Sequence, residues 1–190
     1  SAPTAWNTQT DANDVVVVVI DTGIDYTRPD LIPNLWTDPT NSSSHGYTCI
    51  GGSCVAGGAD DFGHGTHVAG TIGARGNDSA GMAGINWQVK LLSMKFLDQN
   101  GSGAISDAVV AFQKVLALKQ ANPSVPMLTS NSWGGGGFSQ ALKDAMSAVE
   151  ALGVVDVCAA GNSGVNADSN PMYPAAYDNR GIISVLATRS

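Results

Sequence analysis

Val15-Val16-Val17-Val18-Val19-Ile20-Asp21-Thr22-Gly23 is the stretch of this chain with the clearest structural signal. Its run of β-branched residues favours a strand, because such side chains pack well on a pleated surface. Both faces of the run are apolar, which is typical of a strand that is covered on both sides in a parallel sheet. The run ends on the carboxylate of Asp21.

Similar apolar runs follow along the chain and are also predicted to be strands, at residues 89–94, 127–130, 154–159 and 182–186. Helical patterns lie between some of them. One apolar stripe recurs with helical spacing and comprises Ile105, Val109, Phe112 and Leu116. A second comprises Leu142, Ala145, Met146, Val149 and Leu152, with Ser139 as the expected N-cap and Gly153 at the expected end. This alternation predicts an α/β fold.

The composition fits one globular domain and disfavours several classes of protein. The 190 residues are 43% hydrophobic and 13% charged, which excludes a disordered or fibrous chain. The net charge of −7 disfavours a nucleic-acid partner, since phosphate binding needs a basic face, and it suits an extracellular protein or one that binds a hard cation. No apolar run is long enough for a transmembrane helix. Ser1 opens onto a polar segment, so we expect that any targeting segment has been removed or was never present.

Residues 33–58 are rich in Ser, Asn, Gly and Pro and lack periodicity, so we expect a long surface excursion without regular structure.

Cys49 and Cys54 bracket a tight glycine loop, which is the spacing of a local disulfide that would add about 2 kcal/mol of stability. A zinc site with His45 is the alternative, but that ligand set is incomplete. Cys158 lies in an apolar strand pattern and is expected to be a buried structural thiol.

Polar residues follow the predicted strands at Asp21, Asn131-Ser132 and Gly161-Asn162. In open α/β sheets, functional residues collect at the carboxyl ends of the strands. These positions therefore predict a functional site at one edge of the sheet.

Asp21 ends a buried strand, so its carboxylate needs a hydrogen-bond donor or a function. Asp-Thr-Gly is also the active-site triplet of aspartic proteases, but those enzymes are all-β and this sequence alternates strands with helices. An Asp that only caps a turn is the other alternative.

His64-Gly65-Thr66-His67-Val68-Ala69-Gly70 provides a candidate base at the start of a closely packed helix. An imidazole there can take a proton from a hydroxyl while a carboxylate orients its other nitrogen. A zinc site at His64 and His67 is disfavoured, because the spacing is i, i+3 and no Glu lies between them. His67 is instead expected to be a buried, hydrogen-bonded structural residue.

Together these segments resemble, in order, the sequence blocks of subtilisin-like serine proteases, the subtilases. The catalytic-Asp and catalytic-His blocks are matched by Asp21-Thr22-Gly23-Ile24-Asp25, with Pro29-Asp30-Leu31 after it, and by His64-Gly65-Thr66-His67-Val68-Ala69-Gly70. The later blocks are similar to Asn131-Ser132-Trp133-Gly134, Ala159-Ala160-Gly161-Asn162, and Tyr173-Pro174-Ala175-Ala176-Tyr177 followed by Ile183-Ser184-Val185. The resemblance covers nearly the whole chain. It implies a subtilisin-like, mostly parallel sheet with helices on both faces.

The resemblance also implies roles for individual residues in a serine endopeptidase. Asp21 would orient His64, His64 would act as general base and then general acid, and the side-chain amide of Asn162 would donate to the oxyanion. Two segments would line the cleft as edge strands that pair with an extended polypeptide substrate: Gly101-Ser102-Gly103 and Ser132-Trp133-Gly134. Ordinary turns are the alternative for both segments.

A structural calcium ion is the cofactor that the resemblance implies. Its expected ligands are Asp30 and the loop at residues 75–81, in which Asp78 is the preferred side chain. Carboxylates and carbonyls at a glycine-containing turn suit an oxygen-seeking ion. A solvated polar loop is the alternative.

The serine nucleophile is missing from the resemblance. Subtilases carry it on a later Gly-Thr-Ser segment, and neither that triplet nor Gly-x-Ser-x-Gly occurs here. Residues 1–190 are therefore expected to form an incomplete catalytic domain without its C-terminal part, from a secreted or extracytoplasmic enzyme, with the remainder of the domain as a partner. Alternatives are a shortened chain and a non-catalytic relative that binds peptides. A nucleotide-binding domain is disfavoured, because the turn after the valine run lacks a phosphate-binding glycine array.

Overall fold

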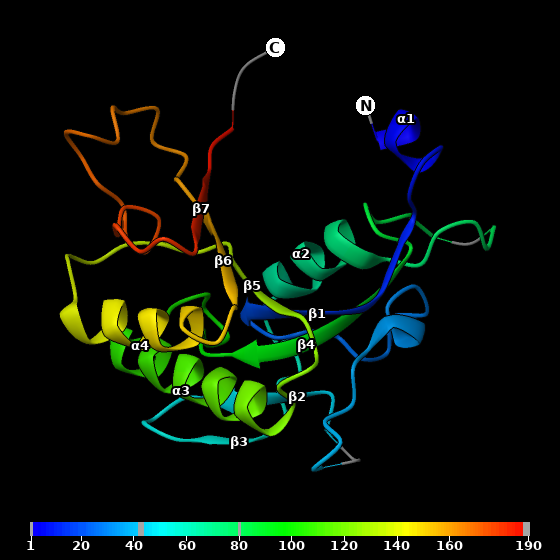
Figure 1. Cartoon of the computed structure of the whole chain (residues 1–190), viewed down its shortest axis with the longest axis horizontal. Coiled ribbons are helices and arrows are strands. Elements are labelled where there is room, and N and C mark those ends of the chain that lie inside the picture. Colours follow the sequence, from blue (N-terminus) through cyan, green and yellow to red (C-terminus); the bar gives the residue numbers. More distant parts are fainter. Residues whose placement is uncertain (1, 42–43, 80, 188–190) are drawn as a thin grey trace.

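The computed structural model describes residues 2–41, 44–79 and 81–187. Within these residues, seven strands form one sheet in the order β3-β2-β4-β1-β5-β6-β7 (Figure 1). The strands are β1 (Asp11–Asp21), β2 (Gly46–Cys49), β3 (Cys54–Ala56), β4 (Gln88–Lys95), β5 (Met127–Asn131), β6 (Val155–Ala159) and β7 (Ile182–Val185). The helices are α1 (Ala2–Trp6), the 3-10 helix η1 (Ile32–Asn34), α2 (His64–Gly73), α3 (Ile105–Ala121) and α4 (Gln140–Glu150).

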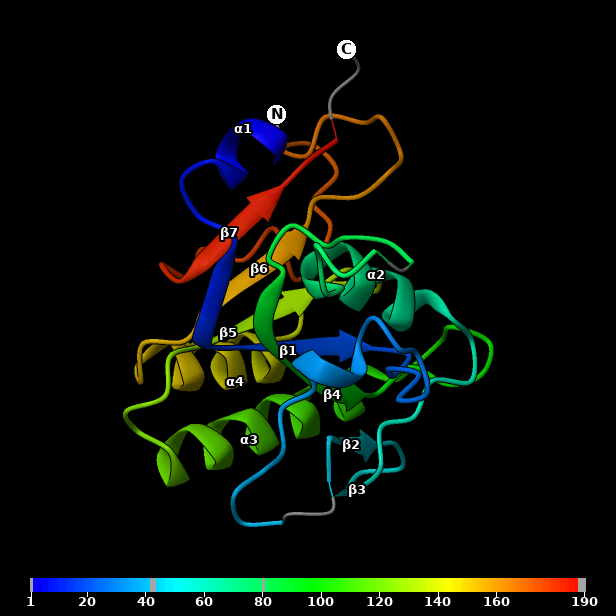
Figure 2. The same cartoon turned by 90° about the vertical axis from the view of Figure 1, so that its right-hand side faces the viewer.

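The sheet is mostly parallel, as predicted. Neighbouring strands pair in parallel throughout, except that β2 and β3 pair antiparallel. β1 lies at the centre, where Val19 pairs with Ser93 of β4 and with Ser130 of β5. Figure 2 shows β2 and β3 toward one end of the sheet and β6 and β7 toward the other.

Helices cover both faces of the sheet, and the valine run explains how. Val16 and Val18 belong to the core under α3 and α4, whereas Val17 and Val19 pack against α2. Alternate side chains of a strand point to opposite faces, so a run that is apolar at every position supplies both cores. Figure 1 shows α3 and α4 on one side of the sheet and α2 on the other. Among the described residues, no helix combines the length and apolar character needed to cross a bilayer.

The buried face of α3 is rotated from the predicted stripe. Phe112 is fully buried, but Ile105, Val109 and Leu116 are only partly buried at its margin. The centre of the contact is formed by Ala108, Ala111, Phe112, Val115 and Leu118. The small alanines let the helix approach the sheet closely. The predicted stripe was based on large apolar residues, so it left these alanines out.

The second predicted helix is confirmed as α4, with one error at its end. The Ser139 hydroxyl caps the helix by accepting a hydrogen bond from the Leu142 N–H at 3.3 Å. Leu142, Met146 and Val149 are buried, but Leu152 is 39% exposed. The helix ends at Glu150, so Leu152 lies beyond it and no longer follows the helical period.

The prediction of an irregular excursion at residues 33–58 was wrong in part. β2 and β3 form a hairpin within it, and β2 extends the sheet beside β4. The predicted disulfide joins Cys49 and Cys54, which face each other in this hairpin. Strands of four and three residues are too short to give a periodic signal. Cys158 is fully buried as expected, and burial raises the pKa of its thiol to about 12.

Asp156 on β6 is a buried carboxyl that the sequence reasoning missed. It is 1% exposed, and its Oδ1 accepts a hydrogen bond from the Thr129 hydroxyl on β5. Its Oδ2 has no partner among the described residues. Burial raises the pKa of Asp156 to about 7, against the lowering effect of the Thr129 hydrogen bond. Asp156 is therefore largely protonated below neutral pH in the folded state.

Asp156→Asn is expected to remove a pH dependence of stability. The pKa is higher in the folded state than in the unfolded state, so the stability that protonated Asp156 contributes is fully present below about pH 4 and is lost as pH rises through 7. The free energy of unfolding of the wild type should therefore fall over this range relative to the variant, by about 2–4 kcal/mol. Denaturant unfolding of the wild type and of Asp156→Asn at pH 4 and pH 8 measures this difference in the free energy of unfolding. Asp168→Asn, at an exposed position, should behave as the wild type. Parallel pH profiles of wild type and Asp156→Asn would contradict the prediction.

Candidate active site

An open cleft of about 670 Å³ lies at the carboxyl ends of β1, β5 and β6. The site residues predicted from sequence that line it are His64, Gly101, Ser102, Gly103, Ser132, Trp133, Gly134 and Asn162. The carboxyl-end rule therefore located the cleft correctly. Apolar side chains that the sequence reasoning did not select also line it, namely Phe62, Phe96, Leu97, Ile105 and Met172.

Asp21 and His64 are in direct contact beside this cleft. The Nδ1 atom of His64 lies 2.8 Å from Oδ1 and 2.9 Å from Oδ2 of Asp21. Asp21 is fully buried, whereas the His64 side chain is 44% exposed. A carboxylate on Nδ1 leaves Nε2 as the nitrogen that can exchange a proton with a molecule in the cleft.

Opposing influences set the ionisation of Asp21. Burial raises its pKa, while hydrogen bonds from His64 and from the Thr22 N–H, which lies 2.7 Å from Oδ1, act in the opposite direction. A buried carboxylate is stable only with such partners. Burial prevails, so the pKa of Asp21 is raised above its usual value. A carboxylate in this position can hold the imidazole and can stabilise an imidazolium.

Glycines allow the contact between Asp21 and His64. A Cβ on Gly65 would lie 2.2 Å from the carbonyl oxygen of Gly23, so only glycine lets the first turn of α2 rest on the turn after β1. Gly23 itself has φ +117°, a conformation that favours glycine. Both glycines are needed to bring the imidazole to the carboxylate.

Asn162 lies just after β6 and is exposed in the same cleft as His64. Its amide group can donate hydrogen bonds to an oxygen held there. The cleft therefore combines an oriented imidazole with a polar donor, an arrangement suited to acyl transfer.

Comparison with known proteins gives the family. The model described as the subtilase family, Peptidase_S8, matches residues 12–190. The chain belongs to the subtilase family. Fervidolysin of Fervidobacterium pennivorans is 33% identical to this subtilase in an alignment of 189 residues that covers 96% of this chain and 24% of fervidolysin. Subtilisin DY of Bacillus licheniformis is 36% identical in an alignment of 181 residues that covers 93% of this chain and 57% of that protein.

Solved structures show the same fold. Sphericase matches this subtilase with a TM-score of 0.78 and S41 psychrophilic protease with one of 0.79, each at 27% identity, with 96% of this chain and 58% of the other covered. This subtilase thus spans little more than half of those chains, and the subtilisin-like fold predicted from sequence is confirmed.

Two expectations about the surroundings of the subtilase site were wrong. The segments Gly101-Ser102-Gly103 and Ser132-Trp133-Gly134 line the cleft as loops and not as strands. The first is held by Asp98, whose Oδ1 accepts hydrogen bonds from the N–H groups of Asn100 at 2.8 Å and Ser102 at 3.1 Å. A loop fixed by a side chain leaves its remaining backbone groups available to a ligand. His67 is exposed and not buried, because the i+3 position of α2 faces away from the sheet.

The expected calcium ligands of this subtilase lie at one loop, but the fit is incomplete. Asp30 Oδ2 accepts a hydrogen bond from the Met82 N–H at 3.1 Å, and Asp78 lines an open hollow of about 290 Å³ formed by the loop. Ala80 of this loop lies outside the described residues. Across the described parts of the chain, no group of three or more His, Cys, Asp or Glu side chains is placed to hold a metal. An ion there would need backbone carbonyls as further ligands.

Proposed function

We propose that this chain is part of a serine endopeptidase that hydrolyses peptide bonds in proteins. The contact of Nδ1 of His64 with both carboxylate oxygens of buried Asp21, at the edge of a cleft in a subtilase, supports this proposal best. Asp21 orients the imidazole, and His64 takes the proton of the attacking hydroxyl and later gives it to the leaving amine. Asn162 donates to the oxyanion of the tetrahedral intermediate.

The substrate that we propose is an extended polypeptide. The loops at residues 101–103 and 132–134 line the cleft and present glycine-rich backbone, which suits main-chain hydrogen bonding to an extended chain. Apolar side chains around them, such as Phe62 and Met172, offer contacts to substrate side chains.

We place the nucleophile on a serine outside residues 1–190. The sequence holds no Gly-Thr-Ser triplet, and the chain covers only 24% of fervidolysin and 57% of subtilisin DY. The partner implied is the remainder of the same catalytic domain. A non-catalytic, peptide-binding subtilase is the second candidate, but a binding protein has no need of the buried Asp21–His64 pair.

We further propose that the enzyme acts outside the cytoplasm. Two relatives from Bacillus subtilis, 33% and 36% identical to this chain, are named minor extracellular protease Epr and cell wall-associated protease. The Cys49–Cys54 disulfide suits an oxidising compartment.

Casein hydrolysis by the full-length protein tests the proposed activity. We expect cleavage that phenylmethylsulfonyl fluoride abolishes and that pepstatin and E-64 leave unchanged, because the first sulfonylates an activated serine whereas the other two act on aspartic and cysteine proteases. Casein binding without cleavage would favour the peptide-binding alternative, and inhibition by pepstatin would indicate an aspartic protease.

We also propose a structural calcium ion held by Asp30, Asp78 and carbonyls of the loop at residues 75–81. The contact of the Asp30 carboxylate with this loop supports the proposal. Calcium at 100 times its dissociation constant should raise the free energy of unfolding by about 2.7 kcal/mol. Melting temperatures of the full-length protein with calcium and with EGTA measure this. Asp30→Asn should lose most of the difference and Asp168→Asn should keep it, whereas equal melting temperatures of the wild type in both buffers would contradict the site.

A further inference from the structure

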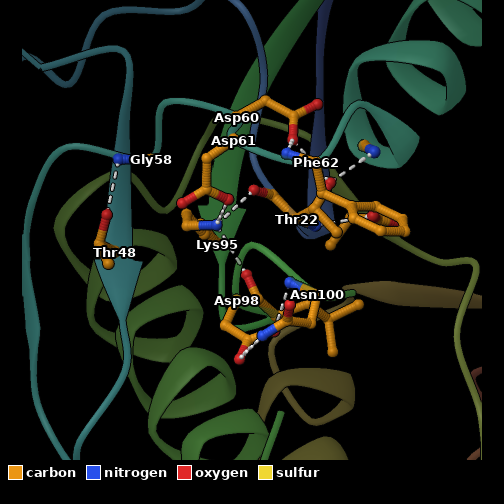
Figure 3. A network of polar contacts seen from close by, with 12 residues as sticks. Thr22, Thr48, Gly58, Asp60, Asp61, Phe62, Lys95, Asp98 and Asn100 are labelled. Carbon is orange, nitrogen blue, oxygen red and sulfur yellow. Dashed lines mark hydrogen bonds and ion pairs between the residues drawn. The ribbon is translucent and has the colours of Figure 1, made fainter. Parts of the chain in front are cut away.

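Asp60 lies in the loop that leads into α2, and its carboxylate is saturated with hydrogen bonds. Oδ1 accepts from the N–H groups of Phe62 at 3.0 Å and Gly63 at 2.8 Å. Oδ2 accepts from the N–H of Thr66 at 3.0 Å and also from its hydroxyl. Figure 3 shows Asp60 and Phe62 beside Thr22 in this network. Asp60 therefore fixes the first turn of the helix that begins at His64.

The same carboxylate also contacts Thr22, the residue that directly follows the strand ending at Asp21. Thr22 donates its hydroxyl to Asp60 Oδ1 at 2.9 Å, and the same hydroxyl oxygen accepts from the Gly65 N–H at 2.8 Å. The N–H of Thr22 donates to Asp21. Thr22, which follows Asp21, is thus bonded both to Asp60 and to Gly65, which follows His64.

The charge of Asp60 suits this place. The N-cap residue of α2 is Gly63, which has no side chain to cap the helix, so Asp60 supplies the missing acceptor from outside. A carboxylate near the N-terminus of a helix is also favoured by the helix dipole. Burial opposes ionisation of Asp60, but hydrogen bonds from Thr66, Gly63 and Phe62 outweigh it and lower the pKa to about 2. Asp60 is therefore ionised throughout the neutral range.

We propose that Asp60 is a positioning residue that holds Asp21 and His64 in contact by joining Thr22 to the first turn of α2. The proposal rests on the proposed function, because it assigns Asp60 a role in the same reaction. Asp60 acts through its neighbours and is not a catalytic residue: its hydrogen bonds go to Thr22, to Thr66 in the first turn of α2, and to the N–H groups of Phe62 and Gly63 just before the helix. When these bonds are lost, the imidazole is free to shift from the carboxylate, and displacements of about 1 Å cost up to about 10²-fold in rate.

The adjacent Asp61 provides a matched control. Its side chain is 50% exposed and pairs with Nζ of Lys95 at 2.5 Å. Lys95 in turn donates to the carbonyl oxygens of Thr22 and Leu97, each at 2.8 Å. Figure 3 shows Asp60 and Asp61 side by side with Lys95 on the side of Asp61. Both changes to Asn remove one negative charge next to the cleft, but only the change at Asp60 disturbs the first turn of α2.

The first test compares Asp60→Asn and Asp61→Asn in the full-length protein with a peptide substrate. An Asn at position 60 has one acceptor oxygen in place of two, so it cannot keep all five hydrogen bonds. We expect kcat to fall about 10- to 100-fold with KM changed less than about twofold, because position and not substrate binding is affected. Asp61→Asn should change kcat less than about threefold. An unchanged kcat in Asp60→Asn, or equal losses in both variants, would overturn the proposal.

The second test observes the Asp21–His64 contact without turnover. The proton on Nδ1 of His64, shared with Asp21, is expected as a low-field resonance in the ¹H NMR spectrum that disappears in Asp21→Asn. In Asp60→Asn it should move upfield or exchange with water faster, and in Asp61→Asn it should stay. An unchanged resonance in Asp60→Asn would overturn the proposal, whether or not the wild type is active. Inactivity of the wild type alone would reject only the proposed function.

A further pair of variants applies if Asp60→Asn does not fold. Thr66→Val removes the hydroxyl that donates to Asp60, whereas Thr66→Ser keeps it. We expect the loss in kcat and the change in the low-field resonance in Thr66→Val, and their rescue in Thr66→Ser. Equal behaviour of the two variants would overturn the proposal.

Discussion

His64→Ala is expected to lower kcat of the proposed peptidase by about 10⁶-fold, the size of loss that removal of the same group causes in subtilisin, a relative of this chain. The imidazole is the group oriented by Asp21, with both carboxylate oxygens within 2.9 Å of Nδ1. Without it, the hydroxyl of the nucleophile has no base to take its proton. Single-turnover and steady-state assays with a chromogenic peptide measure the loss.

His67→Ala is the matched control for this variant. His67 lies on the same helix one turn further on, and its side chain is exposed. It should keep kcat within about twofold of the wild type, in line with surface substitutions elsewhere. If His64→Ala kept more than about 1% of wild-type activity, His64 would not be the general base.

Asp21→Asn is expected to lower kcat by about 10⁴-fold, as for the corresponding change in a serine-protease triad. An amide in place of the buried carboxylate presents an NH₂ group or a weaker acceptor to Nδ1 of His64. The imidazole then favours the tautomer with its proton on Nε2, which cannot accept a proton from the nucleophile.

Asp25→Asn tests whether that loss is specific. Asp25 lies four residues later, where its carboxylate pairs with Arg28 at the surface. Its replacement should leave kcat nearly unchanged. A loss below about tenfold in Asp21→Asn, or a comparable loss in Asp25→Asn, would contradict the role given to Asp21.

The central part of the fold was predictable because it rests on local pattern. The valine run fills both cores of the sheet from one strand, and its apolar character on both faces is visible in the sequence. The same strand places Asp21 at the carboxyl edge, and the carboxyl-end rule selected Ser132 and Asn162, which line one cleft together with His64. These inferences need no knowledge of which segments touch.

The features that were missed depend on contacts between distant segments. The β2–β3 hairpin is too short to give a period and is held by its pairing with β4 and by the disulfide. The burial of Asp156 on β6 follows from its place beside Thr129 of the neighbouring strand β5. A sequence pattern does not report such neighbours.

Asp60 illustrates the same limit at the site. Its partners are backbone N–H groups and the hydroxyls of Thr22 and Thr66, and backbone donors leave no trace in a sequence. The signal that could have found it is its place three residues before the glycine N-cap of α2, because such a helix needs an acceptor from elsewhere. His67 was misplaced because the motif that contains it carries no information about which of its side chains faces solvent.

The most direct test of the central claim is the intact mass of the full-length protein before and after treatment with a fluorophosphonate, followed by peptide mapping of the adduct. We predict one adduct per molecule, on a serine outside residues 1–190, and no adduct in His64→Ala. A folded wild-type protein that gains no mass, or an adduct on a serine within this chain such as Ser132, would contradict the assignment of Asp21 and His64 to a triad with an external nucleophile.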